Sequence, residues 1–416
     1  MLDFKPPKDS PFAIGLAKLL LPAILKVTLH DTQVEVVDGG LERFHCLCGL
    51  RTVICPNHSN HNDPEVMFAL SKLVGEDFNF LAAREIFDYD QGWRGFWLQR
   101  LGCYSIVRGA SDRESFKTTK SLIAANKKKL VIFPEGEISR QNDTLLHLEA
   151  GVCQMSFWAL DDLVKRQDFE PVYILPVALK YIYRENIRQN LEAALYHIEE
   201  RMCLRGNMQD PLYKRLGTVA DSLLSTLEQE YNYKPAAGST RNDRIVGLRG
   251  AILKNIAGYL QLELRNGQSQ LEQVRILRNA LDDYIYSNGD EVWSAYQKKL
   301  HDEKTTKIKG FYRDLDRVLN FIAIYDGYLR ERLTQERFAE VVDRFEVEVF
   351  GKSSTKGPRL VFIDPGRPID LMLVYEQYRA NKKVAIQQVT DDVSRQITGK
   401  LDELERRRPV FYVDEG

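Results

Sequence analysis

Hydrophobic positions over residues 33–184 follow two alternating patterns. Short apolar runs rich in β-branched and aromatic residues predict strands at 33–37, 51–55, 78–82, 104–107, 130–133 and 172–181. Apolar residues at helical spacing lie between these runs and predict helices at 64–73, 93–101, 113–125 and 151–163. Strands that alternate with helices indicate an α/β layered domain with a mostly parallel sheet.

A different pattern begins near Arg184 and continues to residue 356. The strand signal disappears, and apolar residues recur at helical spacing with charged faces between them. One such run is Ile245, Leu248, Ile252, Ile256 and Tyr259. We therefore predict an all-α helical module over residues 185–356, in which the apolar stripes form the module's own core.

The strand pattern returns after Lys356-Gly357-Pro358. An apolar run at 359–363 is followed by the turn signal Asp364-Pro365-Gly366, and one amphipathic helix is predicted over about 371–406. A single strand needs a sheet to join, and the N-terminal domain contains the only predicted sheet. We therefore predict that the helical module is an insertion and that residues 357–416 complete the α/β domain.

Residues 1–32 contain an apolar stretch at 12–29, which Lys18, Pro22 and Lys26 interrupt. Its longest uncharged run is far below the ~20 residues that cross a bilayer, and no small-residue cleavage site follows, so neither a transmembrane helix nor a secretory signal is predicted. An apolar helix with lysines on one side favours a position in a membrane interface. A buried core helix is the alternative.

Charge and cysteine content narrow the choice of partners. The formal net charge is −1, so no global field attracts nucleic acid, and no nucleic-acid partner is expected. The six cysteines form no Cys-x-x-Cys arrangement and predict reduced, mostly buried thiols in a cytosolic setting.

His58 and Asp63 follow the predicted strand at 51–55. If the first turn of a helix lies between them, the carboxylate can accept a hydrogen bond from one ring nitrogen and leave the other nitrogen as a general base. Considered alone, the pair is more typical of a helix cap with an unrelated histidine. His61 adds a second imidazole, but no further ligand stands nearby at suitable spacing, so no zinc site is predicted.

Three further segments stand at or near the ends of predicted strands. They are Gly102-Cys103-Tyr104-Ser105-Ile106-Val107-Arg108, Phe133-Pro134-Glu135-Gly136 and the Pro176-Val177-Ala178 part of the last run. Ligands of open α/β sheets bind beyond the carboxyl ends of strands. Arginine at such a place suits an anionic group, because the guanidinium can donate two hydrogen bonds to phosphate.

The order of these segments resembles that in the glycerolipid acyltransferase superfamily, whose best-known member is 1-acylglycerol-3-phosphate acyltransferase. His58-(x)4-Asp63 corresponds to the first motif, a His-x4-Asp arrangement, and the Glu135-Gly136 segment to the third. Ala83-Arg84-Glu85 resembles a basic and acidic pair between the first two motifs. Arg367-Pro368-Ile369 resembles the end of the family's last strand. The resemblance covers about residues 12–184 and 357–380.

The resemblance implies a reaction and a role for each matching residue. His58 would deprotonate an acceptor hydroxyl that attacks the thioester of acyl-CoA or acyl-carrier protein, and Asp63 would orient His58. The implied substrate-binding residues are Arg84, Arg108, Glu135, Gly136, Ser139, Arg140 and Pro176. No metal or bound cofactor is implied, since the thioester is a co-substrate.

The roles within this set differ. Arg108 would hold the acceptor's phosphate, Glu135 and Gly136 would position its glycerol portion, and Pro176 would shape the acyl pocket. The N-terminal helix would seat the protein on the membrane that supplies its lipid substrate. This implies a peripheral or monotopic protein on the cytoplasmic face of a membrane.

Two features depart from the family. The third motif usually continues Thr-Arg-Ser, whereas this chain has Glu137-Ile138-Ser139-Arg140. A carboxylate beside a phosphate is unfavourable unless Arg140 takes over through a shifted register, so the acceptor need not be lysophosphatidate. The second departure is the helical insertion, which could cover the mouth of the site, dimerise or recognise the acyl donor.

We therefore predict an O-acyltransferase of phospholipid biosynthesis that acts on 1-acylglycerol-3-phosphate, with glycerol-3-phosphate and lysophospholipids as alternative acceptors. A non-catalytic lipid-binding or scaffold protein on the same fold is a second reading, against which the intact His58, Asp63 and Glu135 argue. An unrelated hydrolase lacks support, because the chain has no Gly-x-Ser-x-Gly segment.

Overall fold

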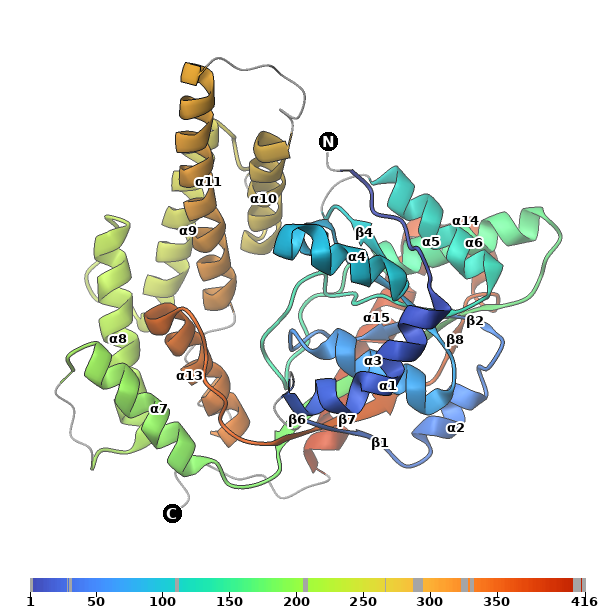
Figure 1. Cartoon of the computed structure of the whole chain (residues 1–416), viewed down its shortest axis with the longest axis horizontal. Coiled ribbons are helices and arrows are strands. Elements are labelled where there is room, and N and C mark those ends of the chain that lie inside the picture. Colours follow the sequence, from blue (N-terminus) through green and yellow to red (C-terminus); the bar gives the residue numbers. More distant parts are fainter. Residues whose placement is uncertain are drawn as a thin grey trace.

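The computed structural model describes residues 3–27, 29, 32–108, 112–204, 209–265, 267–286, 295–322, 328–329, 333–406 and 413. Two regions lie side by side: an α/β region built around a sheet, and a helical region (Figure 1). The helical region is formed mainly by segments from the middle of the chain, while the first segments meet residues 359–406 in the α/β region. Val413, near the C-terminus, packs in the core of α7, α8 and α13.

The described strands form one sheet in the order β1-β7-β6-β2-β5-β3-β4, with β8 beside β6. Their bounds are β1 Gln33–Val36, β2 Arg51–Pro56, β3 Phe78–Ala83, β4 Cys103–Ile106, β5 Lys129–Val131, β6 Val172–Tyr183, β7 Arg359–Pro365 and β8 Ile369–Asp370. Strands β6, β2, β5, β3 and β4 run parallel, and β7 is antiparallel to β6. The predicted fold class, α/β with a mostly parallel sheet, is confirmed.

Burial explains why the strands differ in sequence. All residues of the central strand β2 are buried, which is why it has a continuous apolar core rather than an alternating pattern. Strand β1 lies at the edge and alternates between exposed and half-buried positions.

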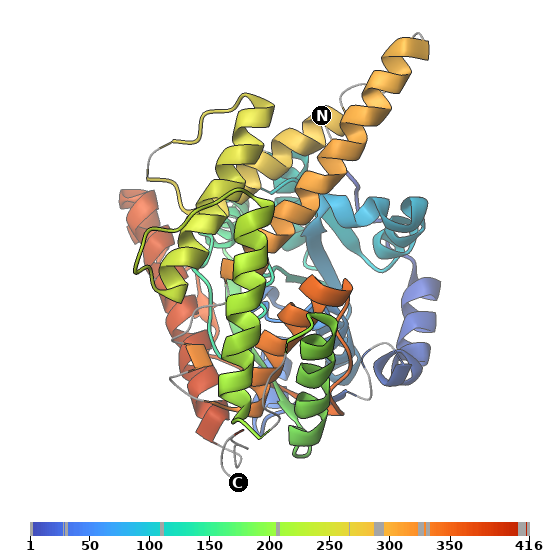
Figure 2. The ribbon, with the colours of Figure 1, turned by 90° about the vertical axis from the view of Figure 1, so that its left-hand side faces the viewer.

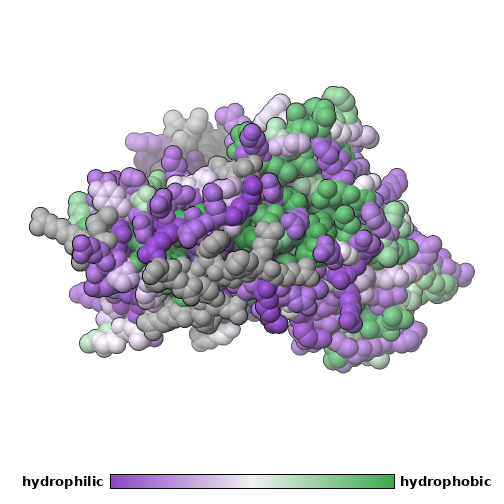
Figure 3. All heavy atoms as spheres, turned by 90° about the horizontal axis from the view of Figure 1, so that it is seen from below, coloured by the Kyte–Doolittle hydropathy of each residue, from purple (hydrophilic) through white to green (hydrophobic). Residues whose placement is uncertain are grey.

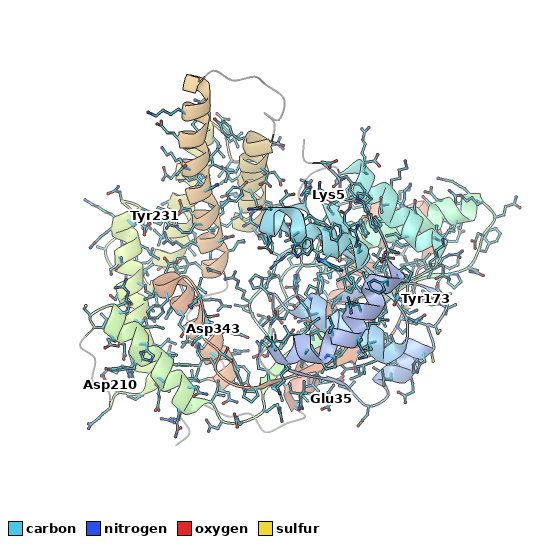
Figure 4. The ribbon with its side chains drawn as sticks, viewed as in Figure 1. Lys5, Glu35, Tyr173, Asp210, Tyr231 and Asp343 are labelled. Atoms are coloured by element: carbon cyan, nitrogen blue, oxygen red, sulfur yellow. The ribbon has the colours of Figure 1, made fainter. Side chains whose placement is uncertain are left out.

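Helices cover both faces of the sheet. One face packs against α5 (Arg113–Ala125), α6 (Gly151–Lys165) and α15 (Lys382–Arg406), with α14 (Tyr375–Ala380) beside α15. The other packs against α2 (Gly40–His45) and α3 (Asp63–Val74), and α1 (Pro11–Val27) lies on α3. Figure 2 shows α15 and α1 on opposite sides of the molecule. The turns of η1 (Arg84–Gly92) and helix α4 (Trp93–Arg100) adjoin β4, and Lys5 pairs with Ser105 of β4 (Figure 4).

Strand β7 joins the C-terminal segment to this sheet. It pairs in parallel with β1 on one side and antiparallel with β6 on the other. The chain therefore returns to the α/β sheet after the helical region, as the lone apolar run at 359–363 suggested. The domain boundaries at residues 32, 184 and 356 stay predictions.

The single predicted helix over 371–406 is wrong. Helix α14 ends before Asn381, which has an extended backbone, and α15 then begins at Lys382. The Asn381 side chain accepts a hydrogen bond from the Val384 amide (3.2 Å), so it caps the second helix. An asparagine within an apolar periodic pattern therefore marked a helix start. Short elements such as α2, η1 and β8 were not predicted either.

The described residues of 185–356 are largely helical. They form α7 (Arg188–Arg201), α8 (Leu212–Glu230), α9 (Arg241–Leu260), α10 (Gln270–Tyr286), α11 (Ala295–Ile322) and α13 (Gln335–Phe350). Helices α7, α8 and α13 share one core, and α9, α10 and α11 share another with the end of α8. The stripe predicted on α9 is buried except for Tyr259, which is exposed at the core's edge. Tyr231 after α8 donates to Asp314 of α11 (2.6 Å; Figure 4).

The six cysteines are all free. Cys55, Cys103 and Cys153 are buried, but Cys46, Cys48 and Cys203 are exposed, so the expectation of mostly buried thiols holds for half of them. The first two exposed cysteines follow α2, where Phe44 and Leu47 occupy the inward positions. No described helix combines the length and apolarity that crossing a membrane requires.

Candidate active site

The sequence motifs meet where the parallel strands end. His58 follows β2, Glu135 follows β5, and Arg84 and Arg108 follow β3 and β4. These four strands are neighbours in the order β2-β5-β3-β4. Because carboxyl ends of parallel strands lie at one edge of a sheet, residues far apart in the chain share one site.

His58 and Asp63 form the predicted pair. The His58 Nδ1 atom lies 2.9 Å from Asp63 Oδ2, and the Asp63 side chain is fully buried at the start of α3. Two further donors fix the carboxylate: the Asn60 amide to Oδ2 (2.8 Å) and the Tyr181 hydroxyl to Oδ1 (2.7 Å). A carboxylate can only accept, so Nδ1 carries the proton and Nε2 is the basic nitrogen.

The surroundings of His58 fix its ring and its backbone. The imidazole stacks on Phe133 with ring centroids 4.1 Å apart, and its side chain is 15% exposed, so a small substrate group can reach it. Asn57 ties the loop to β6 by donating to the Leu179 carbonyl (3.0 Å) and accepting from the Leu179 amide (2.7 Å). The ring is therefore held in place rather than free to rotate.

Glu135 connects the first and third motifs. Its Oε1 accepts from the His58 amide (2.5 Å) and its Oε2 from the Leu146 amide (2.9 Å), and the side chain is fully buried. Burial raises the pKa of Glu135 to about 8, although both amide bonds oppose this. The Ser139 amide returns a bond to the His58 carbonyl (2.7 Å). Glu135 therefore fixes the His58 backbone, and its contact with a glycerol group stays a prediction.

Arg108 lies between two carboxylates. Its Nη1 is 2.6 Å from Glu137 Oε2 and donates to the Gly136 carbonyl (3.0 Å), and its Nη2 donates to Glu85. Glu137 stands where the family has threonine, and it is buried against this guanidinium. The unexpected acid thus pairs with the arginine that the resemblance assigns to phosphate.

The remaining predicted residues lie around this centre. The Arg140 guanidinium donates to Asn320 of α11 and lies 3.4 Å from His61 Nε2, on the side of the helical region. Ser139 is buried, and its Oγ accepts from the Gln141 amide (3.2 Å). Arg140 therefore contacts another part of the site than Arg108, and its suggested replacement of the motif arginine stays a prediction.

Arg84 and Pro176 have mainly structural contacts. Arg84 lines the pocket beside Arg108, but its guanidinium donates to the Asp3 carbonyl (2.5 Å) and to Asp88 (2.8 Å), which fixes the N-terminal segment. Pro176 is buried on β6 opposite Cys55, and its carbonyl accepts from the Gly366 amide (2.8 Å). Their roles in substrate binding stay predictions.

A polar pocket lies next to Arg108. Its lining residues are Arg84, Glu85, Val107, Arg108, Glu137, Arg275, Arg278, Asn279 and Asp282. The last four belong to α10, so the helical region forms one wall of the pocket. Sequence reasoning missed these four residues, as it missed Tyr181. Their spacing in the chain, a polar stripe on one face of a helix, was the available signal.

The described part of the chain contains no group of three His, Cys, Asp or Glu side chains arranged to hold a metal ion. His61 instead lies beside Arg140.

Residues 36–180 match the model of the Acyltransferase family. This span contains His58, Asp63, Arg108 and Glu135, and it forms an acyltransferase domain of the 1-acylglycerol-3-phosphate acyltransferase-like family. The domain supports a glycerolipid-type acyltransferase in general. No curated protein matches the chain. The helical region lies beyond the matched span.

Proposed function

We propose that this protein transfers an acyl group from an acyl thioester, acyl-CoA or acyl-carrier protein, to a hydroxyl of a glycerolipid. The favoured acceptor is 1-acylglycerol-3-phosphate, which would become phosphatidate. One observation carries the proposal: within an acyltransferase-family domain, a buried carboxylate orients His58, and the Glu135-Gly136 segment that holds the His58 backbone also accepts a hydrogen bond from Arg108 of the pocket. This is a base and its orienting group, with no protein nucleophile between them.

The reaction proceeds by direct transfer. His58 Nε2 takes the proton of the acceptor hydroxyl while the oxygen attacks the thioester carbonyl carbon. Asp63 stabilises the imidazolium that forms, because its Oδ2 accepts the Nδ1 proton (2.9 Å). The tetrahedral intermediate then collapses, the carbon–sulfur bond breaks, and the imidazolium returns the proton to the leaving thiolate. The products are the acylated lipid and the free thiol carrier.

A membrane surface is the proposed source of the lipid. Helices α1 and α4 contact each other and expose large apolar side chains. These are Phe12, Leu16, Leu19, Leu20 and Val27 on α1, and Trp93, Phe96 and Trp97 on α4. Figure 3, seen from below, shows apolar residues gathered on the half of the molecule formed by the α/β region. Aromatic side chains with a polar tip suit the boundary between lipid and water.

Thiol release tests the transfer directly. The purified chain is given acyl-CoA with 1-acylglycerol-3-phosphate, glycerol-3-phosphate or a lysophospholipid, and free CoA is followed. We expect release that requires an acceptor and that disappears in His58→Ala. Release without any acceptor would indicate a thioester hydrolase. Lipid binding without turnover, for either an acyl-CoA or an acyl-carrier-protein donor, would favour a scaffold and contradict the enzyme.

A further inference from the structure

We infer that helix α10 of the helical region completes the acceptor's head-group site, and that Arg275 and Arg278 bind the acceptor's anionic phosphate together with Arg108. The inference rests on the proposed function and names the substrate class more closely. It also gives the helical region a task at the active site, that of selecting phosphate-bearing acceptors.

Helix α10 presents two distinct faces. Val274, Leu277 and Leu281 are buried in the core that α10 shares with α9 and α11. The opposite stripe, Arg275, Arg278, Asn279 and Asp282, lines the pocket. Asn279 anchors the stripe, because its Nδ2 donates to the Arg108 carbonyl (2.6 Å). The helix is therefore fixed against the residue that the family resemblance assigns to phosphate.

Arg275 stands at the third motif itself. Its Nη2 donates to the Glu135 carbonyl (3.2 Å), and its Nη1 pairs with Glu149. Gly136 has a φ of +70°, and a Cβ atom there would lie 2.9 Å from Arg275 Nη2. The guanidinium thus occupies the space beside the Glu-Gly segment, close to where the family motif continues with an arginine and this chain has Ile138.

Arg278 approaches Arg108 from the opposite wall. Its Nη2 pairs with Asp316 (2.7 Å), but its Nη1 is 3.7 Å from Glu85 Oε1, the carboxylate that also accepts from Arg108. An anion placed between the two guanidiniums would give both a shared partner. Phosphate oxygens suit this task, since arginine donates to them through paired N–H groups.

Both arginines also retain a donor. In the described part of the chain, the Nε groups of Arg275 and Arg278 are buried and have no hydrogen-bond acceptor. A buried N–H group without an acceptor is costly.

The pocket's four arginines can donate to an anion, although each of them also has a carboxylate partner. Four of its lining residues are arginines, and the facing carboxylates are Glu85, Glu137 and Asp282. Burial raises the pKa of Asp282 to about 6, so this carboxyl keeps most of its charge at neutral pH. Glu85 and Glu137 hold Arg108 in position, and the α10 arginines supply the positive charge that these acids would otherwise cancel.

The test compares two acceptors in the full-length protein. Arg275→Ala and Arg278→Ala are assayed with 1-acylglycerol-3-phosphate and with the neutral monoacylglycerol, at saturating acyl-CoA. We expect the KM for the phosphate acceptor to rise about tenfold to a hundredfold in each variant, as the loss of a bond to a charged group predicts. The KM for monoacylglycerol should not change, nor should the KM for acyl-CoA when its concentration is varied instead. Arg313→Ala is the matched control, because its side chain is 72% exposed on α11.

The alternative is that the arginines only attach the helical region to the α/β region. In that case the KM would change equally for both acceptors, or only the thermal stability of the protein would fall. Either result overturns the inference. Asp316→Asn separates the two ideas, since it removes an ion pair of Arg278 and keeps the guanidinium. We expect the KM for the phosphate acceptor to be unchanged in this variant. A rise in that KM equal to the rise in Arg278→Ala would contradict the inference.

The inference and the proposed function fail in different ways. Wild-type protein that transfers acyl groups only to the neutral acceptor, with activity lost in His58→Ala, would overturn the role of α10 and leave the acyltransferase in place. Absence of acceptor-dependent release for either lipid would remove the enzyme itself.

Discussion

Asp63 accepts from the His58 ring, the Asn60 amide and the Tyr181 hydroxyl. The first bond orients the base, the second closes the turn between the two residues, and the third comes from β6, far away in the chain. Three donors on one buried carboxylate leave it a single orientation. A base held in this way needs no rearrangement before it takes a proton.

Tyr181→Phe should lower kcat with little change in either KM. The substitution removes the donor to Asp63 Oδ1 and keeps the ring, so the carboxylate can turn away from His58. We expect a loss of about tenfold, against about a hundredfold or more for Asp63→Asn, which no longer offers a charged acceptor. Steady-state kinetics measure both. Tyr173→Phe, on the same strand but beside β8 (Figure 4), is the control. A rise in KM alone would contradict a positioning role.

Glu135 gives the molecule a distinct pH response. Its pKa is raised by burial to about 8, above the ordinary value of 4.5, so the folded state binds this proton more tightly than the unfolded state. The stabilising contribution is therefore complete below pH about 4.5 and is lost as the pH rises through about 8. Relative to Glu135→Gln, the wild type should lose up to about 1.4 kcal/mol of unfolding free energy per pH unit in this window.

Urea unfolding of both proteins at several pH values between 5 and 8 measures this difference, and groups common to both cancel. Glu376→Gln, at a side chain that is 85% exposed, should give a curve parallel to the wild type. If the curve for Glu135→Gln is also parallel to that of the wild type, burial does not raise the pKa of the Glu135 carboxyl.

Single residues differ in how far the sequence could predict them. The His58–Asp63 pair follows from local spacing, because both residues lie in one turn. Tyr181 and Arg275 could not be assigned, since their places depend on how β6 and α10 pack against that turn. Glu135 was predicted as a site residue, but its bonds to two backbone amides could not be predicted from a motif.

Among the helices, α4 has a surface that the α/β core does not explain. Trp93 and Phe96 stack with ring centroids 5.5 Å apart, and Trp97 packs edge-on against both. All three are at least one-third exposed, and the guanidinium of Arg100 lies over Phe96. Sequence periodicity predicted the helix, whereas its exposure depends on which face the neighbouring elements leave open.

Removing the α4 aromatics should weaken membrane binding. Trp93→Ala/Trp97→Ala deletes the two indoles beside α1, and we expect partition onto phospholipid vesicles to fall by about tenfold or more, as lost apolar burial predicts. Vesicle sedimentation measures the bound fraction. Tyr196→Ala, an exposed aromatic on α7, should bind as the wild type does. Unchanged binding of the double variant would restrict the docking surface to α1 or contradict it.

At the scale of the whole molecule, one buried ion network joins the helical region to the sheet. Lys180 of β6 pairs with Asp143 (2.6 Å) and with Glu405 of α15, and Arg337 of α13 pairs with the other Asp143 oxygen (2.8 Å). The return of the chain to the sheet could be predicted from one apolar run. These contacts could not, because their partners come from four distant segments.

Lys180→Met should destabilise the protein by about 3 kcal/mol or more, because it leaves Asp143 and Glu405 buried with less compensating charge. Burial alone would raise the pKa of Asp143, but Lys180 and Arg337 hold it below its ordinary value. The network's stabilising contribution is therefore present at neutral pH and lost as the pH falls through that lowered pKa. Urea unfolding at pH 7 and in acid should show a difference in unfolding free energy between wild type and variant that shrinks on acidification.

Lys382→Met is the control. It removes an exposed lysine 3.9 Å from Asp161 and should lower the unfolding free energy by less than about 1 kcal/mol. Equal effects of the two substitutions would mean that the network does not hold the regions together.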